Sequence, residues 1–97
     1  VYKRQVSSDE EAIELANSSQ YGLGSIIICD DLERAEQVGN QLDVGMVFIG
    51  GAGLEGPDVP FGGVKKSGYG REMGRVGILE FANKKLFRYA DRTGAAE

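Results

Sequence analysis

Apolar residues recur with helical spacing in three segments of the chain. The first follows Ser8, where residues 8–11 (Ser-Asp-Glu-Glu) have the form of a capping box, and it predicts a helix from about Asp9 to Asn17. The second has N-cap candidates at Asp30 and Asp31 and predicts a helix that ends at residues 43–45. The third predicts a helix over about residues 72–82, with Met73, Val76 and Leu79 facing inward.

Two short runs are apolar throughout, at residues 24–29 and at Met46–Ile49. Such runs are typical of parallel strands that are covered on both faces. With the helix between them, they predict a βαβ unit. Leu86–Tyr89 alternates weakly and predicts an edge strand. The predicted fold class is α/β: an open parallel-sheet fragment with flanking helices and a C-terminal edge strand.

A long glycine-rich loop follows the second apolar run, from Gly50 to about Arg71. Loops of this length are uncommon in a compact domain unless they are functional. Most of the fifteen glycines lie between Gly45 and Gly77, so the demand for unusual backbone geometry is concentrated there. Ligands of open α/β sheets bind beyond the carboxyl ends of parallel strands, which is where this loop begins. We therefore expect the loop to form the functional site.

Residues 51–56 spell Gly-x-Gly-x-x-Gly, the pattern of dinucleotide-binding loops. That pattern must open a helix whose N-terminus holds the pyrophosphate. Here Pro57 and Pro60 follow, and residues before proline are pushed out of the helical conformation. The run at residues 63–67 does not match a phosphate loop either. The sequence therefore predicts no nucleotide-binding loop.

Composition narrows the classes of function. The chain has 97 residues, 41% of them hydrophobic and 27% charged, as in one small soluble domain. The net charge is −4 with dispersed cations, so we expect no nucleic-acid partner and no membrane partner. The chain has no histidine and one cysteine, which excludes an internal disulfide and a Cys-His pair, and we expect no metal site. We interpret Cys29 as an inert apolar residue and expect a cytoplasmic protein.

Residues 60–72, Pro-Phe-Gly-Gly-Val-Lys-Lys-Ser-Gly-Tyr-Gly-Arg-Glu, resemble the C-terminal signature of the aldehyde dehydrogenase superfamily at every specified position. The likeness runs from about Glu10 to Tyr89. Residues 57–63 and 80–86 look most like bacterial succinate-semialdehyde dehydrogenases. The resemblance implies an aldehyde-dehydrogenase-like fold and the oxidation of a small aldehyde to a carboxylic acid, with NAD or NADP accepting the hydride.

The resemblance also implies a substrate-channel wall within this chain. By position, it assigns Phe61 to that wall together with Gly50, Leu54 and Glu55 from the long loop. The sequence departs from the family at Gly50, where asparagine is usual. Loss of that amide is expected to loosen the loop or to remove a hydrogen bond near the site.

Several charged or polar residues near the end of the loop have an ordinary structural role by sequence, and the resemblance implies a functional role in addition. Glu72 begins a predicted helix, where a carboxylate complements the helix dipole; the resemblance places it behind the general-base glutamate, as support for proton transfer. Lys65 and Arg71 are ordinary surface charges by sequence. The resemblance assigns Lys65 and Ser67 to support of the loop, and Arg71 to the neighbourhood of a subunit contact.

In the family, a cysteine thiolate attacks the aldehyde, hydride leaves for the nicotinamide, and a glutamate-activated water hydrolyses the thioester. The resemblance places that cysteine, that glutamate and the cofactor-binding domain upstream of Val6. It thus implies an inactive C-terminal fragment of a homo-oligomer, a dimer or tetramer, with NAD or NADP bound by the missing upstream domain. Residues 6–84 would belong to the catalytic domain, and residues 85–97 would form an oligomerisation strand and a frayed tail.

The first five residues, Val-Tyr-Lys-Arg-Gln, coincide with the translation of a transposon end used in preparing sequencing libraries. We therefore expect residues 1–5 to be a non-native leader. Two other interpretations of the whole chain remain open. One is a non-catalytic member of the family, which Gly50 and the unseen upstream region make possible. The other is an assembly module that joins a partner through an exposed strand edge. The upstream cysteine and gel filtration of the isolated chain discriminate between them.

Overall fold

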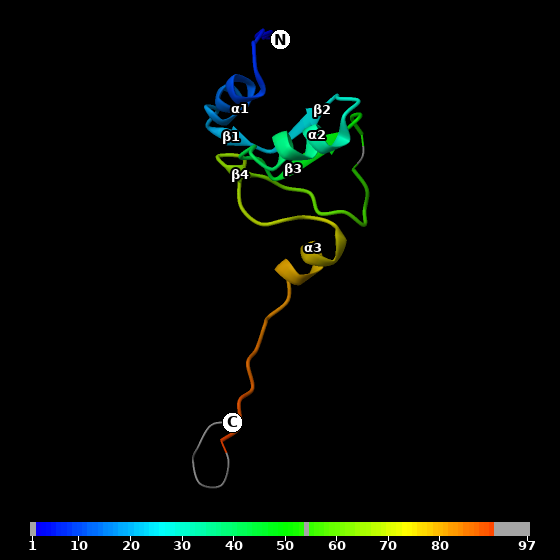
Figure 1. Ribbon diagram of the computed structural model, residues 1–97. Coiled ribbons are helices and arrows are strands. Elements are labelled where there is room, and N and C mark those ends of the chain that lie inside the picture. Colours follow the sequence, from blue (N-terminus) through cyan, green and yellow to red (C-terminus); the bar gives the residue numbers. More distant parts are fainter. Residues whose placement is uncertain (1, 54, 91–97) are drawn as a thin grey trace.

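The computed structural model describes residues 2–53 and 55–90. Its elements, in chain order, are α1 (Asp9–Asn17), β1 (Tyr21–Gly22), β2 (Gly24–Ile27), α2 (Leu32–Gly39), β3 (Met46–Ile49), β4 (Val64–Lys65) and α3 (Gly74–Glu80). The strands β2 and β3 form a parallel pair, and β1 and β4 form an antiparallel pair (Figure 1). The small α/β architecture confirms the predicted fold class in its coarse form.

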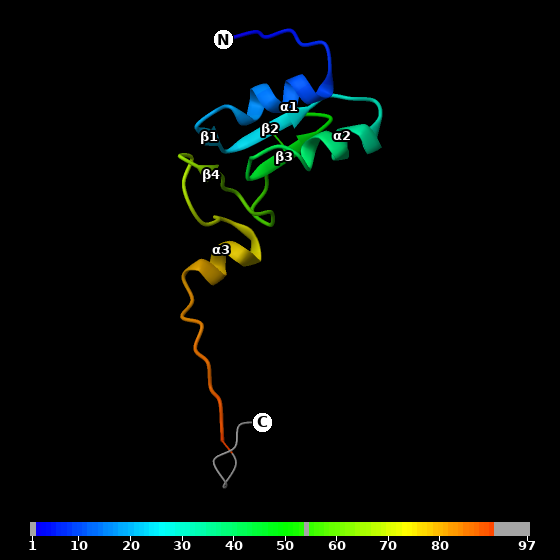
Figure 2. The ribbon, with the colours of Figure 1, turned by 60° about the vertical axis from the view of Figure 1, so that its left-hand side comes forward.

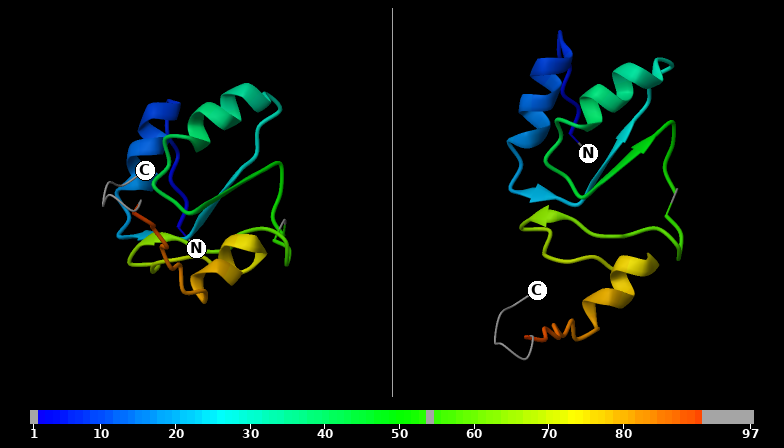
Figure 3. Two further views of the ribbon diagram at one scale, coloured as in Figure 1. Left: turned by 90° about the horizontal axis from the view of Figure 1, so that it is seen from below. Right: turned by 60° about the horizontal axis from the view of Figure 1, so that its bottom comes forward.

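The βαβ unit is confirmed. β2 and β3 pair in parallel from Gly24 opposite Met46 to Ile27 opposite Ile49, with α2 connecting them. Gly39 of α2 lies against Val47 and Ile27, so α2 covers the face of the sheet to which these two side chains belong. Figure 3 shows α1 and α2 on one side of the β2–β3 pair, and the long loop with α3 on the other.

The bounds of α1 and β3 agree with those predicted, and α2 is shorter. Ser8 caps α1 because its Oγ accepts a hydrogen bond from the Glu11 N–H at 3.2 Å. Asp31 caps α2 in the same way, through the Arg34 N–H. The predicted end of α2 at residues 43–45 is wrong. The helix stops at Gly39. The N–H groups of residues 41 and 42 donate to carbonyl oxygens three residues earlier, as in a 3₁₀-helix, so these residues are outside the α-helix.

The predicted burial of both faces of the parallel sheet is wrong for this chain. Ile26 is 51% exposed, and Ile28, which was predicted to belong to the same strand, lies beyond its end at Ile27 and is 75% exposed. The reason is that the sheet has two strands, and the helices of the described chain cover one of its faces. Within the described residues, Ala35 is the one hydrophobic residue that is fully buried.

The antiparallel pairing of β1 with β4 was not predicted. Tyr21 lies opposite Lys65, and Gly22 lies opposite Val64. This brings the long loop back across the start of the βαβ unit. Two glycines permit the close approach: a Cβ on Gly45 would collide with the carbonyl oxygen of Gly62, and one on Gly63 would lie 2.7 Å from the carbonyl oxygen of Gly22. The crossing therefore ties the loop to the sheet by backbone contact.

The last helix differs from its prediction. α3 begins at Gly74, two residues later than expected, because Met73 adopts a φ of 58° and the Gly74 N–H donates to the Pro57 carbonyl at 2.9 Å. Met73, Val76 and Leu79, which were predicted to face inward, are 43%, 42% and 39% exposed. Ile78 and Phe81 are more exposed, at 74% and 93%, so the three predicted residues are partly covered but not buried in the described chain.

The edge strand predicted at Leu86–Tyr89 does not form here. Residues 83–89 are neither helix nor strand, and their side chains are exposed. A strand needs a neighbour for its N–H and C=O groups, and no described segment lies beside this one. Figure 2 shows the segment running away from the rest of the molecule. Residues 91–97, expected to be a frayed tail, lie outside the described residues.

The chain is extended. Its radius of gyration is 19.6 Å, with extents of 67 × 27 × 27 Å, whereas a compact domain of about 100 residues has a radius of about 13 Å. In residues 2–53 and 55–90, no helix has the length and apolar character needed to cross a membrane.

Candidate functional site

The uncovered face of the β2–β3 sheet and the long loop together enclose a hollow of about 390 Å³, which we call the sheet groove. Its floor comes from the strands, where Ile26 lies opposite Phe48 in the parallel register. Its wall comes from Phe61 and Glu55 of the loop. The lining residues are Leu23, Gly24, Ser25, Ile26, Met46, Phe48, Glu55 and Phe61. The groove is thus largely apolar, with one carboxylate at its wall.

Two of the four predicted channel residues, Phe61 and Glu55, line this groove. Gly50 does not line it. Its N–H donates to the Ile27 carbonyl at 2.8 Å, and its φ of 88° lies in the left-handed region that glycine and, next to it, asparagine tolerate. Leu54 lies outside the described residues. The assignment of these residues to a substrate channel stays a prediction.

Phe61 is held by a backbone bridge to Glu72. The Phe61 N–H donates to the Glu72 carbonyl at 2.8 Å, and the Glu72 N–H donates to the Phe61 carbonyl at 2.7 Å. On the other side of this bridge, Phe61 and Glu72 line a smaller hollow of about 170 Å³, together with Glu80 and Phe81. The Glu72 side chain is exposed and does not line the sheet groove, so its support of proton transfer stays a prediction.

Arg71 braces the loop from within. Its Nη1 donates to the carbonyl oxygens of Gly63 at 2.8 Å and Gly70 at 2.7 Å. A charged donor between two backbone acceptors makes stronger hydrogen bonds than a neutral one. Arg71 therefore joins the two ends of the turn over residues 63–70. Its expected place near a subunit contact stays a prediction.

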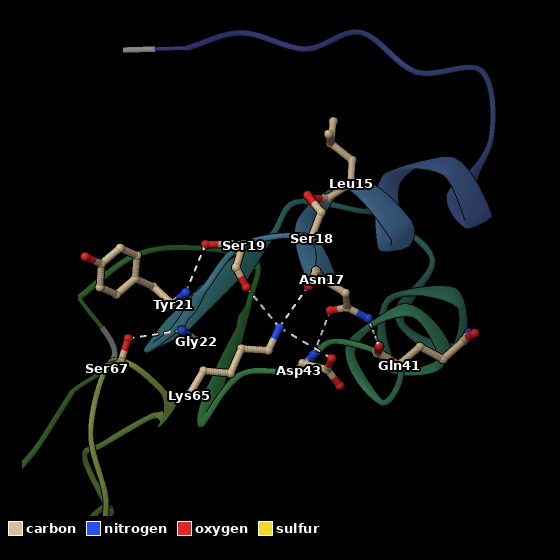
Figure 4. Close-up of polar contacts among 10 residues, drawn as sticks. All are labelled: Leu15, Asn17, Ser18, Ser19, Tyr21, Gly22, Gln41, Asp43, Lys65 and Ser67. Carbon is tan, nitrogen blue, oxygen red and sulfur yellow. Dashed lines mark hydrogen bonds and ion pairs between the residues drawn. The ribbon is translucent and has the colours of Figure 1, made fainter.

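Ser67 and Lys65 join the loop to the start of the βαβ unit (Figure 4). The Ser67 Oγ accepts a hydrogen bond from the Gly22 N–H at 3.0 Å. The Lys65 Nζ donates to the carbonyl oxygens of Asn17 at 2.9 Å and Ser19 at 3.2 Å, and lies 3.4 Å from the Asp43 carboxylate. Both side chains thus connect the loop to the segments around α1 and β1; the role in loop support that the resemblance assigns to them stays a prediction.

Sequence reasoning missed Asn17, which it treated as a helix end. The Asn17 Nδ2 donates to the Gln41 carbonyl at 2.8 Å, and its Oδ1 accepts from the Asp43 N–H at 2.8 Å. The only signal in the sequence was the residue type, because a carboxamide offers a donor and an acceptor in one side chain. Its partners, 24 and 26 residues away, were not visible in the sequence.

The strongest ion pair lies away from the groove and joins α1 to α2. The Arg34 guanidinium donates from Nε and Nη2 to the two carboxylate oxygens of Asp9, both at 2.7 Å. These hydrogen bonds lower the pKa of Asp9 and raise the pKa of Arg34. The hydrogen bond from the Ser7 N–H, with one from its hydroxyl, lowers the pKa of Glu11. These charges stabilise the frame that carries the site.

The described residues do not fit a dinucleotide or a metal ion. After the glycine run at residues 51–56, the chain enters a turn at Pro57 and Asp58 and forms no helix before α3. It therefore offers no helix N-terminus to a pyrophosphate. No group of three acidic, cysteine or histidine side chains in these residues is placed to hold a metal ion. Cys29 is free and half-buried just beyond β2.

The family model described as "Aldehyde dehydrogenase family" matches residues 2–87. Over 84 residues the chain is 50% identical to succinate-semialdehyde dehydrogenase (NADP(+)) of Deinococcus radiodurans, covering 87% of this chain and 18% of that protein. It is 44% identical over 84 residues to aminoaldehyde dehydrogenase 1, peroxisomal, of Pisum sativum, covering 86% of this chain and 17% of that protein.

A solved structure agrees with these relatives. The crystal structure of succinic semialdehyde dehydrogenase from Streptococcus pyogenes, in complex with NADP+ as the cofactor, superimposes with a TM-score of 0.82 at 46% identity. The match covers 87% of this chain and 18% of that one. The chain thus spans about 18% of the length of the first relatives that it matches.

Proposed function

The chain belongs to the aldehyde dehydrogenase family, and from this premise we propose that it is the C-terminal part of an NAD(P)-dependent enzyme that oxidises succinic semialdehyde or a similar small aldehyde to a carboxylic acid. The observation that carries this proposal is the 50% identity to a succinate-semialdehyde dehydrogenase over 84 residues. The 44% identity to an aminoaldehyde dehydrogenase extends the set of aldehydes to be tested to amino-substituted ones.

In this proposal, the sheet groove is one wall of the aldehyde channel. Ile26, Phe48 and Phe61 present apolar surface, which suits the carbon chain of a small aldehyde and keeps water away from it. These residues bind and orient the substrate and take no part in the transfer of hydride.

The charge of the groove constrains the choice of aldehyde. Succinic semialdehyde carries a carboxylate, and none of the lining residues of the groove is basic, whereas Glu55 is acidic. A carboxylate placed beside Glu55 would be repelled. We therefore assign the recognition of the substrate carboxylate to a cation outside the residues that line the groove.

We likewise assign the nucleophile, the general base and the NAD(P) site to the upstream part of the enzyme. When bound there, the nicotinamide accepts the hydride. The glycine run at residues 51–56 does not open a helix that could hold the pyrophosphate, and the sequence has no histidine to activate Cys29.

The alternative of a non-catalytic member rests on Gly50 and on the unseen upstream region. The conformation of this residue, with a φ of 88°, suits glycine at least as well as asparagine. A Cβ added at Gly50 meets no atom of the described residues within 4 Å, so these residues offer a longer side chain at this position no contact close to its Cβ. The conformation of Gly50 therefore gives no support to the non-catalytic interpretation, and the upstream cysteine decides between the two.

The proposal is tested by cloning the full-length gene and measuring the reduction of NAD and NADP with succinic semialdehyde, 4-aminobutanal and butanal. We expect turnover by the full-length protein and none by the 97-residue chain alone. Turnover by the short chain would contradict the assignment of the nucleophile and cofactor site to the upstream part. A full-length protein that oxidises none of the three aldehydes would contradict the proposed function.

A further inference from the structure

The Asn17 carboxamide joins the end of α1 to the turn that precedes β3. Its Nδ2 donates to the Gln41 carbonyl and its Oδ1 accepts from the Asp43 N–H, both at 2.8 Å (Figure 4). An asparagine that merely capped its own helix would bond to groups of that helix. Both ends of this side chain are instead engaged on another segment, so Asn17 holds the two segments at a set distance.

Lys65 adds a third segment to this contact. Its Nζ donates to the carbonyl oxygens of Asn17 and Ser19 and lies 3.4 Å from the Asp43 carboxylate. Lys65 has a φ of 55°, a left-handed conformation that glycine adopts more easily. The contacts of its side chain with Asn17, Ser19 and Asp43 explain why a lysine occupies this position. We call Asn17, Asp43 and Lys65 the three-segment clamp.

The clamp adjoins, along the chain, the segments that form the floor and the wall of the sheet groove. Asp43 precedes β3, which carries Met46 and Phe48 on the floor of the groove. Lys65 belongs to β4, which begins three residues after Phe61 on the wall of the groove. The clamp therefore ties the segment that leads into the floor to the segment that leads out of the wall.

We propose that Asn17 is a positioning residue that sets the spacing between Phe61 and the Ile26–Phe48 floor, and thereby the size of aldehyde that the groove accepts. This inference rests on the proposed function and adds a determinant of specificity to it. Asn17 acts through Phe61. Its loss should therefore change selectivity among aldehydes and leave the chemical step with the smallest aldehyde intact.

The kinetic test uses the full-length enzyme with propanal and hexanal. Asn17→Ala should change the ratio of the two kcat/KM values by about two- to tenfold, the range expected for one or two lost hydrogen bonds, with kcat for propanal unchanged. In a Phe61→Ala background, the same substitution should change the ratio no further, since coupled residues are not additive. Equal losses for both aldehydes, or full additivity with Phe61→Ala, would overturn the proposal.

The matched control is Asn40→Ala. Asn40 ends α2, is exposed, and its side chain makes no hydrogen bond to any described residue. This variant should keep the aldehyde ratio of the wild type. A change equal to that of Asn17→Ala would show that the ratio reports general loosening of the fold and would contradict a specific role for Asn17.

A second measurement does not depend on activity. Hydrogen exchange of the full-length protein should be faster over residues 60–68 in Asn17→Ala and in Lys65→Gly, and unchanged in Asn40→Ala. Lys65→Gly is informative because it relieves the left-handed backbone while removing the side chain. Unchanged exchange in both variants would overturn the clamp itself. Faster exchange in a protein that oxidises no aldehyde would instead overturn the proposed function and the selectivity that rests on it.

Discussion

Phe61 and Glu72 are bridged by two backbone hydrogen bonds, of 2.8 and 2.7 Å, which close residues 61–72 into a tied loop. Phe61 turns its side chain to the sheet groove, and Glu72 leads into α3. Because the bridge is made by the main chain, it does not depend on either side chain. Substitution of Phe61 should therefore alter the groove without opening the loop.

Phe61→Ala in the full-length enzyme should lower kcat/KM in a way that depends on aldehyde size. An aromatic wall that contacts the substrate supplies binding and orientation, and its removal should cost about tenfold or more for the aldehydes that touch it. Steady-state kinetics with a series from propanal to hexanal measures this. An equal loss for all aldehydes would make Phe61 a packing residue.

Gly63→Ala should destabilise the protein. A Cβ at this position would lie 2.7 Å from the Gly22 carbonyl oxygen and 2.8 Å from the Leu23 Cα, which are backbone atoms that cannot swing aside. We expect a loss of about 1–3 kcal/mol, as for overpacked sites. Gly51→Ala is the control, because a Cβ at Gly51 meets no atom of the described residues within 4 Å. Urea denaturation of both variants measures the difference, and equal midpoints would contradict the tight crossing.

The Asp9–Arg34 pair makes stability depend on pH in the acid range. The pKa of Asp9 is lowered in the folded state, chiefly by its hydrogen bonds from Arg34. The pair therefore stabilises the fold above the unfolded-state pKa of about 4, and the effect is lost as pH falls through the lower folded-state value. Since both side chains are largely exposed, the effect is small.

The measurement is the difference in urea midpoint between the wild type and Asp9→Asn. It should be positive at pH 7 and shrink toward zero as the pH falls below about 4. Glu10→Gln is the control, since Glu10 makes no ion pair among the described residues, and it should show a smaller difference at pH 7. If the difference in urea midpoint between the wild type and Asp9→Asn grew as the pH fell, the assigned direction of the Asp9 pKa shift would be wrong.

Deleting residues 85–97 should shift the full-length enzyme toward monomer and lower its activity. Leu86–Tyr89 lies exposed, with large apolar side chains at 84%, 71% and 80% for Leu86, Phe87 and Tyr89, and its backbone has no partner strand in the described chain. We propose that a second subunit supplies that partner. Sedimentation and steady-state kinetics test this, with deletion of residues 93–97 as the control. Unchanged size and turnover after the longer deletion would rule out the assembly role.

Local signals were sufficient for α1 and β3. Ser8 marks the start of α1 because its side chain accepts a hydrogen bond from the N–H of Glu11, three residues later. The run at residues 46–49 is apolar without interruption. The features that the sequence did not predict depend on contacts between residues that are distant in the chain. β1 and β4 have two residues each, too few for any periodicity, and their pairing depends on the crossing of Gly45 and Gly63.

Contacts between distant residues also explain the wrong start predicted for the last helix. The start of α3 is set by the hydrogen bond from Gly74 to Pro57, which no local pattern reveals. For the candidate site, the resemblance led to Phe61 and Glu55, which the fold brings to one groove. It gave no reason to single out Asn17, because the role of that side chain is defined by Gln41 and Asp43, which lie more than twenty residues away.

Among the described residues, a Cβ added at Gly50, Gly51 or Gly53 meets no atom within 4 Å, and this has a consequence for how the chain can diverge. Doubling the length of a flexible loop costs only about 0.6 kcal/mol in closure entropy. Insertions or deletions in this stretch would therefore leave the β1–β4 crossing and the βαβ unit undisturbed. Evolution can lengthen or shorten one side of the groove for a new substrate while the frame that carries it keeps its sequence.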